Sequence, residues 1–153
     1  MTTSAHRMMF VNLPVSDLSR SRTYFAELGF AFNDVFSDSK AASLVVNDQA
    51  IVMLLDRSFF GTFVDRPVAD DSSVEVGVGL SAATREEVDA LVDRAIALGG
   101  SPACEPQDEG YMYGRSFYDL DGHLWELIWM DPAAVTPPAT DDWDERGRHI
   151  GGT

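Results

Sequence analysis

The chain has 153 residues, with 11 Lys or Arg against 25 Asp or Glu, for a formal net charge of −14. This balance excludes binding to nucleic-acid phosphates through a basic surface. A hydrophobic fraction of 45% and a charged fraction of 24% are typical of a globular protein. The length predicts one domain, or two small modules that share a core.

The sequence also argues against membrane insertion and disulfide chemistry. No run approaches the roughly 20 apolar residues that span a bilayer, and residues 1–10 hold no stretch suited to a signal peptide. We therefore expect a cytoplasmic protein with no membrane partner. Cys104 is the only cysteine, which excludes an intrachain disulfide and a cysteine-based zinc site. Its acidic, proline-flanked neighbourhood favours a structural or incidental cysteine over a reactive one.

The first half of the chain predicts a strand, a helix and three further strands. A strand is expected over residues 8–15, followed by a helix over 17–28 with Asp17 as its N-cap and Gly29 at its end. Three short runs of strand-forming residues follow, at 30–35, 42–46 and 50–55.

Residues 57–72 form the expected connector between the two halves. The segment carries Phe59, Phe60 and Phe63 among Gly, Pro and polar residues. These rings either form a lid over a pocket or close one end of the core, and the composition leaves both interpretations open.

The second half repeats the order of the first. A strand is expected over 74–80, then a helix over 84–98 that begins with a capping box of Thr84 and Glu87. Strand-like runs follow at 101–105, 112–118 and 124–130. The chain therefore contains an internal repeat, in which the second helix cap, Thr84, follows the first, Asp17, by 67 residues.

The repeat predicts an α+β fold in which two βαβββ modules form paired curved sheets around a cavity. The expected divisions are a first module (1–56), the connector (57–72), a second module (73–131) and a tail (132–153). The tail has no periodicity, so we expect a mobile arm or one that docks on a partner through Trp143.

Two segments carry a resemblance to a known family. Residues 12–30, Asn-Leu-Pro-Val-Ser-Asp-Leu through Leu-Gly-Phe, and residues 117–127, Phe-Tyr-Asp-Leu-Asp-Gly-His-Leu-Trp-Glu-Leu, resemble the vicinal oxygen chelate superfamily. That family includes glyoxalase I, extradiol dioxygenases, fosfomycin-modifying enzymes and bleomycin resistance proteins. The resemblance implies a small-molecule ligand and a homodimer, in which modules pair either within one chain or between chains.

The resemblance also implies where a metal would bind. Family ligands lie on the first and last strand of each module, and the matching positions here are Phe10, Met53, Glu75 and Glu126. Two of the four are apolar, so the expected cofactor is either one divalent ion of unspecified identity or none. His123 or Tyr113 would then help to complete an altered site, although His123 also suits the edge of a structural turn.

The residues themselves single out Glu126. Alternation along 124–130 puts it on one face between Leu124 and Ile128, where a carboxylate is desolvated and suits a general base or a metal ligand. On strand 74–80 the corresponding face carries Glu75, Gly77 and Gly79. Glycines inside a strand indicate either close approach of a ligand or close packing of the two sheets.

Seven residues are also expected to contact a ligand: Phe10, Asn12, Met53, Phe60 of the connector, Tyr113, Arg115 and His123. A phenol beside a guanidinium suits an anionic or polar group, although Arg115 equally suits a structural partner of Asp119 or Glu126.

Two functions compete on this evidence. The first is a glyoxalase- or dioxygenase-like enzyme with a degraded or divergent metal site and Glu126 as its catalytic acid or base. The second is a metal-free, bleomycin-resistance-like protein that binds a cationic aromatic molecule, which the acidic charge and the aromatic residues favour. A fold retained for subunit interaction alone is the third alternative.

Overall fold

The computed structural model describes residues 7–134, so the expected tail contact of Trp143 lies outside the described residues. The first module contains β1 (Met9–Val15), α1 (Leu18–Glu27), β2 (Ala31–Asn33), the 3-10 helix η1 (Asp34–Phe36), β3 (Ala41–Asn47) and β4 (Ala50–Asp56). The connector begins with α2 (Arg57–Gly61). The second module contains β5 (Gly77–Ser81), α3 (Arg85–Ala97), β6 (Ser101–Pro102), β7 (Gln107–Asp108), β8 (Met112–Tyr118) and β9 (Leu124–Met130).

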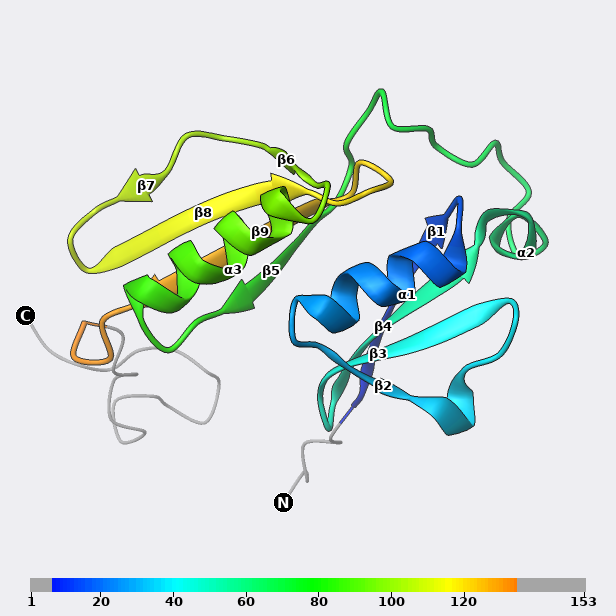
Figure 1. Cartoon of the computed structure of the whole chain (residues 1–153), viewed down its shortest axis with the longest axis horizontal. Helices are drawn as coiled ribbons and strands as arrows, with labels where there is room; N and C mark the ends of the chain where they lie inside the picture. The colour runs from blue at the N-terminus through cyan, green and yellow to red at the C-terminus, as the bar shows by residue number, and fades with distance from the viewer. Residues whose placement is uncertain (1–6, 135–153) are drawn as a thin grey trace, which may run out of the picture.

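Each module is one sheet with one helix on its face (Figure 1). The first sheet has the order β1-β4-β3-β2 and the second β5-β9-β8-β6, with β7 also paired to β8. In both sheets the first strand runs parallel to the last. The expected α+β fold with two βαβββ modules is therefore confirmed.

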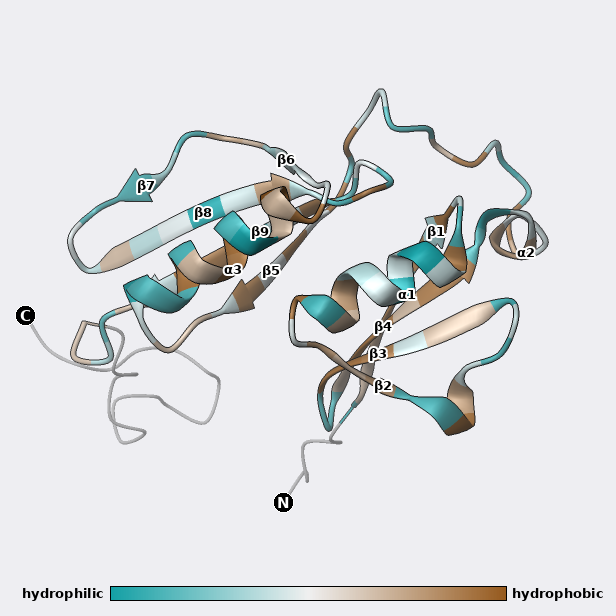
Figure 2. Cartoon of the chain, viewed as in Figure 1, coloured by the Kyte–Doolittle hydropathy of each residue, from teal (hydrophilic) through white to brown (hydrophobic). Residues whose placement is uncertain are grey.

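The helices begin and end where their capping residues predict. Asp17 accepts a hydrogen bond from the Arg20 amide, and Thr84 accepts one from the Glu87 amide. The Glu87 carboxylate reaches back one residue further than a capping box requires, to the Ala83 amide. Figure 2 shows hydrophilic and hydrophobic stretches alternating along α3, as expected for a helix with one face on a sheet.

The second module departs from the expected strand bounds at two places. β5 starts at Gly77 rather than Val74, because its partner β9 starts at Leu124, directly opposite Gly77. The expected strand over 101–105 shortens to the two residues of β6, and a further short strand, β7, follows. Glu75 therefore precedes the sheet, and its side chain is exposed.

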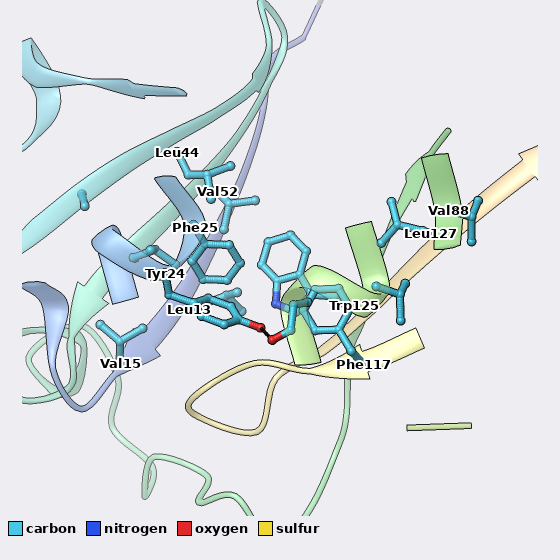
Figure 3. Packing of buried hydrophobic residues seen from close by; sticks show 14 residues of the cluster. Leu13, Val15, Tyr24, Phe25, Leu44, Val52, Val88, Phe117, Trp125 and Leu127 are labelled. Carbon is cyan, nitrogen blue, oxygen red and sulfur yellow. Dashed lines mark hydrogen bonds between the residues drawn. The ribbon is translucent and has the colours of Figure 1, made fainter. Parts of the chain in front are cut away.

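An aromatic core joins the two modules. The rings of Phe25 on α1 and Trp125 on β9 face each other with centroids 5.0 Å apart (Figure 3). The Tyr24 hydroxyl donates to the Ala95 carbonyl of α3 at 2.9 Å. Trp125 is fully buried and Phe25 is 1% exposed, so the modules share one core.

The turn between β8 and β9 adds polar contacts to this junction. Asp121 accepts a hydrogen bond from the Ser16 amide at 2.8 Å, just before α1, and a second from the Ser21 hydroxyl. His123 Nε2 lies 2.7 Å from the Pro14 carbonyl oxygen, so this nitrogen carries the proton and donates. The second module is thus hydrogen-bonded to the start of α1 and the end of β1.

The first strand of each module lies at an edge of its sheet. Within residues 7–134, β1 pairs only with β4 and β5 only with β9. None of the helices in this range is long and apolar enough to cross a membrane. The cytoplasmic location stays a prediction.

Candidate functional site

Three of the expected ligand contacts meet on the first module. Asn12 of β1, Met53 of β4 and Phe60 of α2 line one hollow of about 560 Å³ on the sheet face opposite α1. Phe59, Phe63 and Leu55 add apolar surface to its wall. The connector therefore contributes aromatic rings to a concave, mostly apolar surface, which is typical of a small-molecule site.

Glu126 lies on the corresponding face of the second module. It is directly opposite Gly79 of β5 and Ser116 of β8 in the strand register. Its side chain is half-buried, and it makes no hydrogen bond or ion pair with any residue between 7 and 134. The Ser116 hydroxyl opposite it accepts a hydrogen bond from the Cys104 amide. The Glu126 carboxylate is therefore a candidate to bind a group from outside the described residues.

The strand register defines which positions of the two modules correspond. Asn12 pairs with Met53 in the first sheet as Gly79 pairs with Glu126 in the second. Phe10 likewise pairs with Ile51 as Gly77 pairs with Leu124. The counterpart of Phe10 is therefore Gly77, not Glu75 as the motif match implied. Glu75 does not lie on the strand that would carry a ligand.

The corresponding places of the two modules lack the donors that a divalent ion requires. The four corresponding places carry Phe10, Met53, Gly77 and Glu126, and only the last has an oxygen donor in its side chain. A hard divalent ion requires several oxygen or nitrogen ligands. No group of three His, Cys, Asp or Glu side chains suited to a metal occurs within residues 7–134. The donor set does not fit the metal that the fold family implies.

Tyr113 and Arg115 lie on the opposite face of the second sheet, toward α3. The Arg115 guanidinium bonds Asp89 and Asp93 of that helix, each at 2.9 Å. The Tyr113 hydroxyl donates to Asp89 at 2.7 Å. Arg115 therefore has structural partners, but they are these two helix carboxylates rather than the expected Asp119 or Glu126.

The same contacts change the acidity of the groups involved. The Tyr113 hydroxyl and the Arg115 guanidinium lower the pKa of Asp89, and the hydrogen bond to Asp89 raises the pKa of Tyr113. The phenol therefore stays protonated and the carboxylate stays charged across the neutral range. This cluster holds β8 against α3 and does not face the Glu126 side of the sheet.

His123 and Glu75 line a second hollow, of about 490 Å³, where the connector crosses the junction of the modules. Phe60 and Phe63 belong to both hollows, so the connector forms a shared wall. The hydrogen bond to Pro14 occupies Nε2 of His123. Neither His123 nor Glu75 lies beside Glu126 in the sheet.

The sequence interpretation did not assign a role to Asp121 in joining the modules, or to Asp119 in holding the turn that carries Asp121. Asp119 is 6% exposed and accepts from the Trp125 indole nitrogen at 2.9 Å and from the amides of Asp121 and His123. The signal was the turn sequence Asp-Leu-Asp-Gly, since Asp side chains bond backbone amides two residues ahead.

Comparison with known proteins defines the family. The sequence model of the Glyoxalase/Bleomycin resistance protein/Dioxygenase superfamily matches residues 7–127. The chain belongs to this superfamily. A search of curated proteins finds no match to the chain.

Solved structures agree with this membership. A hypothetical protein from S. aureus is 31% identical, with a TM-score of 0.69, and the match covers 79% of this chain and 91% of that one. A glyoxalase-related enzyme from Fulvimarina pelagi is 19% identical, with a TM-score of 0.71, and covers 96% and 99%. The fosfomycin resistance protein FosX from Listeria monocytogenes is 21% identical, with a TM-score of 0.58, and covers 84% and 94%. The last two likenesses show the fold alone. The match to the family model over residues 7–127 confirms the resemblance to the superfamily.

Proposed function

We propose that this superfamily member binds a small cationic aromatic molecule without a metal ion. The observation that carries the proposal is Glu126, a half-buried carboxylate with no partner among residues 7–134, which Leu124 and Ile128 flank on the same face of β9. A carboxylate in such a position gains most from a charged N–H donor, because charge-assisted hydrogen bonds are roughly twice as strong as neutral ones.

The hollow on the first module supplies the complementary surface. Phe59, Phe60 and Phe63 present aromatic rings there, and Asn12 is a polar side chain at the same wall. Aromatic rings stack on other rings and attract cations at their faces. The net charge of −14 favours a cationic ligand over an anionic one at long range.

An enzyme is the second candidate, in the glyoxalase- and dioxygenase-like manner of the superfamily. The observation that favours it is the same free carboxylate, which is suited to accept a proton as a general base. It ranks second because Phe10, Met53 and Gly77 stand at the other chelate places. We derive no step through a metal ion, and substrate turnover would have to rest on Glu126 alone.

The proposal is tested by calorimetric titration with phenethylamine and with phenylpropionate, an anion of similar size. We expect phenethylamine to bind and phenylpropionate not to bind. Glu126→Gln is expected to weaken phenethylamine binding by about tenfold or more, because one charge-assisted bond contributes roughly 1.5 kcal/mol or more. Bleomycin, a larger cationic molecule, is the second probe.

Glu105→Gln is the matched control, since it removes the same charge from an exposed position without a partner in the described chain. It should leave binding unchanged. Manganese, nickel, zinc and ferrous iron are added in parallel. A stoichiometric ion that Glu126→Gln removes would contradict metal-independent binding and favour the enzyme.

We also infer that the protein is a homodimer. The aromatic hollow lies on the first module and Glu126 on the second, and the first strand of each module, β1 or β5, has one edge that no strand of the described chain pairs with. Met9 is 65% exposed, Phe10 56% and Val76 57%, so apolar side chains lie along or beside these edges. Unpaired edges with apolar side chains favour pairing with another chain.

Sedimentation at micromolar concentration is expected to give a dimer. Phe10→Asp should shift it to a monomer that keeps its fold, because Phe10 is outside the core and a charge at an apolar interface is costly. Phe36→Asp, at a position 66% exposed on η1, is the control and should leave the dimer intact. A wild-type monomer would contradict the inference.

A further inference from the structure

We propose that Gly79 determines ligand specificity at this site: its missing side chain leaves room in front of Glu126 for the charged group of the ligand. The inference rests on the proposed function and adds a size limit to it. Gly79 lies directly opposite Glu126 in the register of β5 and β9, and its position is exposed on the side away from α3.

Backbone conformation does not explain this glycine. The glycines with positive φ in the described chain are Gly29, Gly99, Gly110 and Gly122, so Gly79 has a φ that any residue adopts. Glycine is unfavourable inside a strand, because it loses more backbone entropy and has no side chain to pack. Some other feature must compensate for its presence on a five-residue strand.

Packing within the chain explains Gly77 but not Gly79. A Cβ built at Gly77 would lie 3.2 Å from Leu124 Cδ2, which is too close without a shift of that side chain. A Cβ built at Gly79 would meet only Glu126 Oε2, at 3.8 Å, which is an ordinary van der Waals distance. Within residues 7–134, an alanine would therefore fit at 79 without strain.

What a methyl group at 79 would change is the access to the Glu126 carboxylate. An ammonium nitrogen must approach a carboxylate oxygen to about 2.8 Å to form a charge-assisted hydrogen bond. A methyl carbon 3.8 Å from Oε2 would cover this oxygen on the side that faces β5. Leu124 and Ile128 already flank the same carboxylate along β9. The space above Gly79 is thus suited to the substituents of a bound ammonium group.

The size of that group gives the sharpest test. Calorimetric titration compares phenethylamine with N,N-dimethylphenethylamine, which carries the same charge and ring with two more methyl groups on nitrogen. Wild type is expected to bind both. Gly79→Ala should weaken binding of the dimethyl amine by tenfold or more, which corresponds to about 1.4 kcal/mol. The same variant should weaken binding of the primary amine by a smaller factor. Gly79→Ser should do the same.

Gly114→Ala is the matched control. Gly114 lies on β8 on the same face of the sheet, and a Cβ there would meet Ile128 Cγ1 and the Leu127 carbonyl oxygen, both at 3.7 Å. The added methyl group is therefore as well tolerated as at Gly79 but lies away from Glu126. All three variants should unfold at or above the wild-type temperature, because strand glycines are unfavourable and the added atoms fit. Gly114→Ala should bind both amines normally.

Several outcomes would overturn the inference. If Glu126→Gln weakens binding but Gly79→Ala does not, Gly79 has no role and the proposed function survives. If Gly79→Ala instead dissociates the dimer, the glycine accommodates a second copy of the chain rather than a ligand. If wild type binds neither amine, the proposed function fails, and the inference fails with it.

Discussion

Trp125→Ala is expected to lower the free energy of unfolding by about 4 kcal/mol, in the range measured when a buried aromatic residue is truncated. Trp125 is fully buried, and its ring contacts Phe25 at 5.0 Å, Phe30 at 6.3 Å and Phe117 at 6.5 Å between centroids. Phe25 and Phe30 belong to the first module and Phe117 to the second. The cavity would therefore open where the two modules meet.

Domains of this kind are stabilised by only about 5 to 15 kcal/mol. We therefore expect both modules of the variant to unfold together, in one transition at a lower urea concentration. Urea unfolding followed by far-ultraviolet circular dichroism measures it. Trp129→Ala is the control: this ring is half-buried and has the Arg85 guanidinium 4.9 Å from its centroid. Trp129→Ala should lower the free energy of unfolding by clearly less than Trp125→Ala does. A Trp125→Ala loss below about 1 kcal/mol would contradict a shared core.

The helices were predictable from sequence because their signals are local. Asp17 and Thr84 each cap a helix with a side chain that bonds an amide three residues ahead. Gly29 and Gly99 end them with φ of +101° and +116°, a region that favours glycine. None of these interactions depends on the rest of the fold. The order of elements in both modules followed from them.

The face on which Tyr113 and Arg115 lie was predictable from the sequence, although the two residues were expected to contact a ligand. Alternation alone puts both residues on the face of Phe117, which is 1% exposed in the core. Two acidic residues four apart on the predicted helix, Asp89 and Asp93, were the signal for a basic partner beneath it. Reading the two patterns together would have placed Arg115 against the helix.

The prediction that Glu75 corresponds to Phe10 was wrong for a different reason. The run Val74–Val76 alternates like a strand, yet β5 begins at Gly77, where β9 first provides a partner. Sequence alternation reports which residues suit a strand and not where the neighbouring strand starts. Glu126 was identified correctly as lying on the face of Leu124 and Ile128, because β9 is paired along its whole length.

The second large effect is expected at Asp119, where an amide cannot replace the carboxylate. Three donors bond its side chain: the amides of Asp121 and His123 bond Oδ1, and the Trp125 indole bonds Oδ2. Burial raises the pKa of Asp119, opposed by the charge of His123 and by these donors. In Asp119→Asn, the amide NH₂ would face the indole N–H, leaving two buried donors unsatisfied. We expect a loss of about 2 kcal/mol in urea unfolding.

Asp131→Asn is the matched control, since its carboxylate accepts a single exposed hydrogen bond, from the Ala133 amide, that an amide oxygen also accepts. It should change stability by less than about 0.5 kcal/mol. A double-mutant cycle isolates the cause. In a Trp125→Phe background the indole donor is gone, so Asp119→Asn should cost about 1 kcal/mol less than in wild type. An equal cost in both backgrounds would assign the effect to the turn amides rather than to the link between the turn and the core.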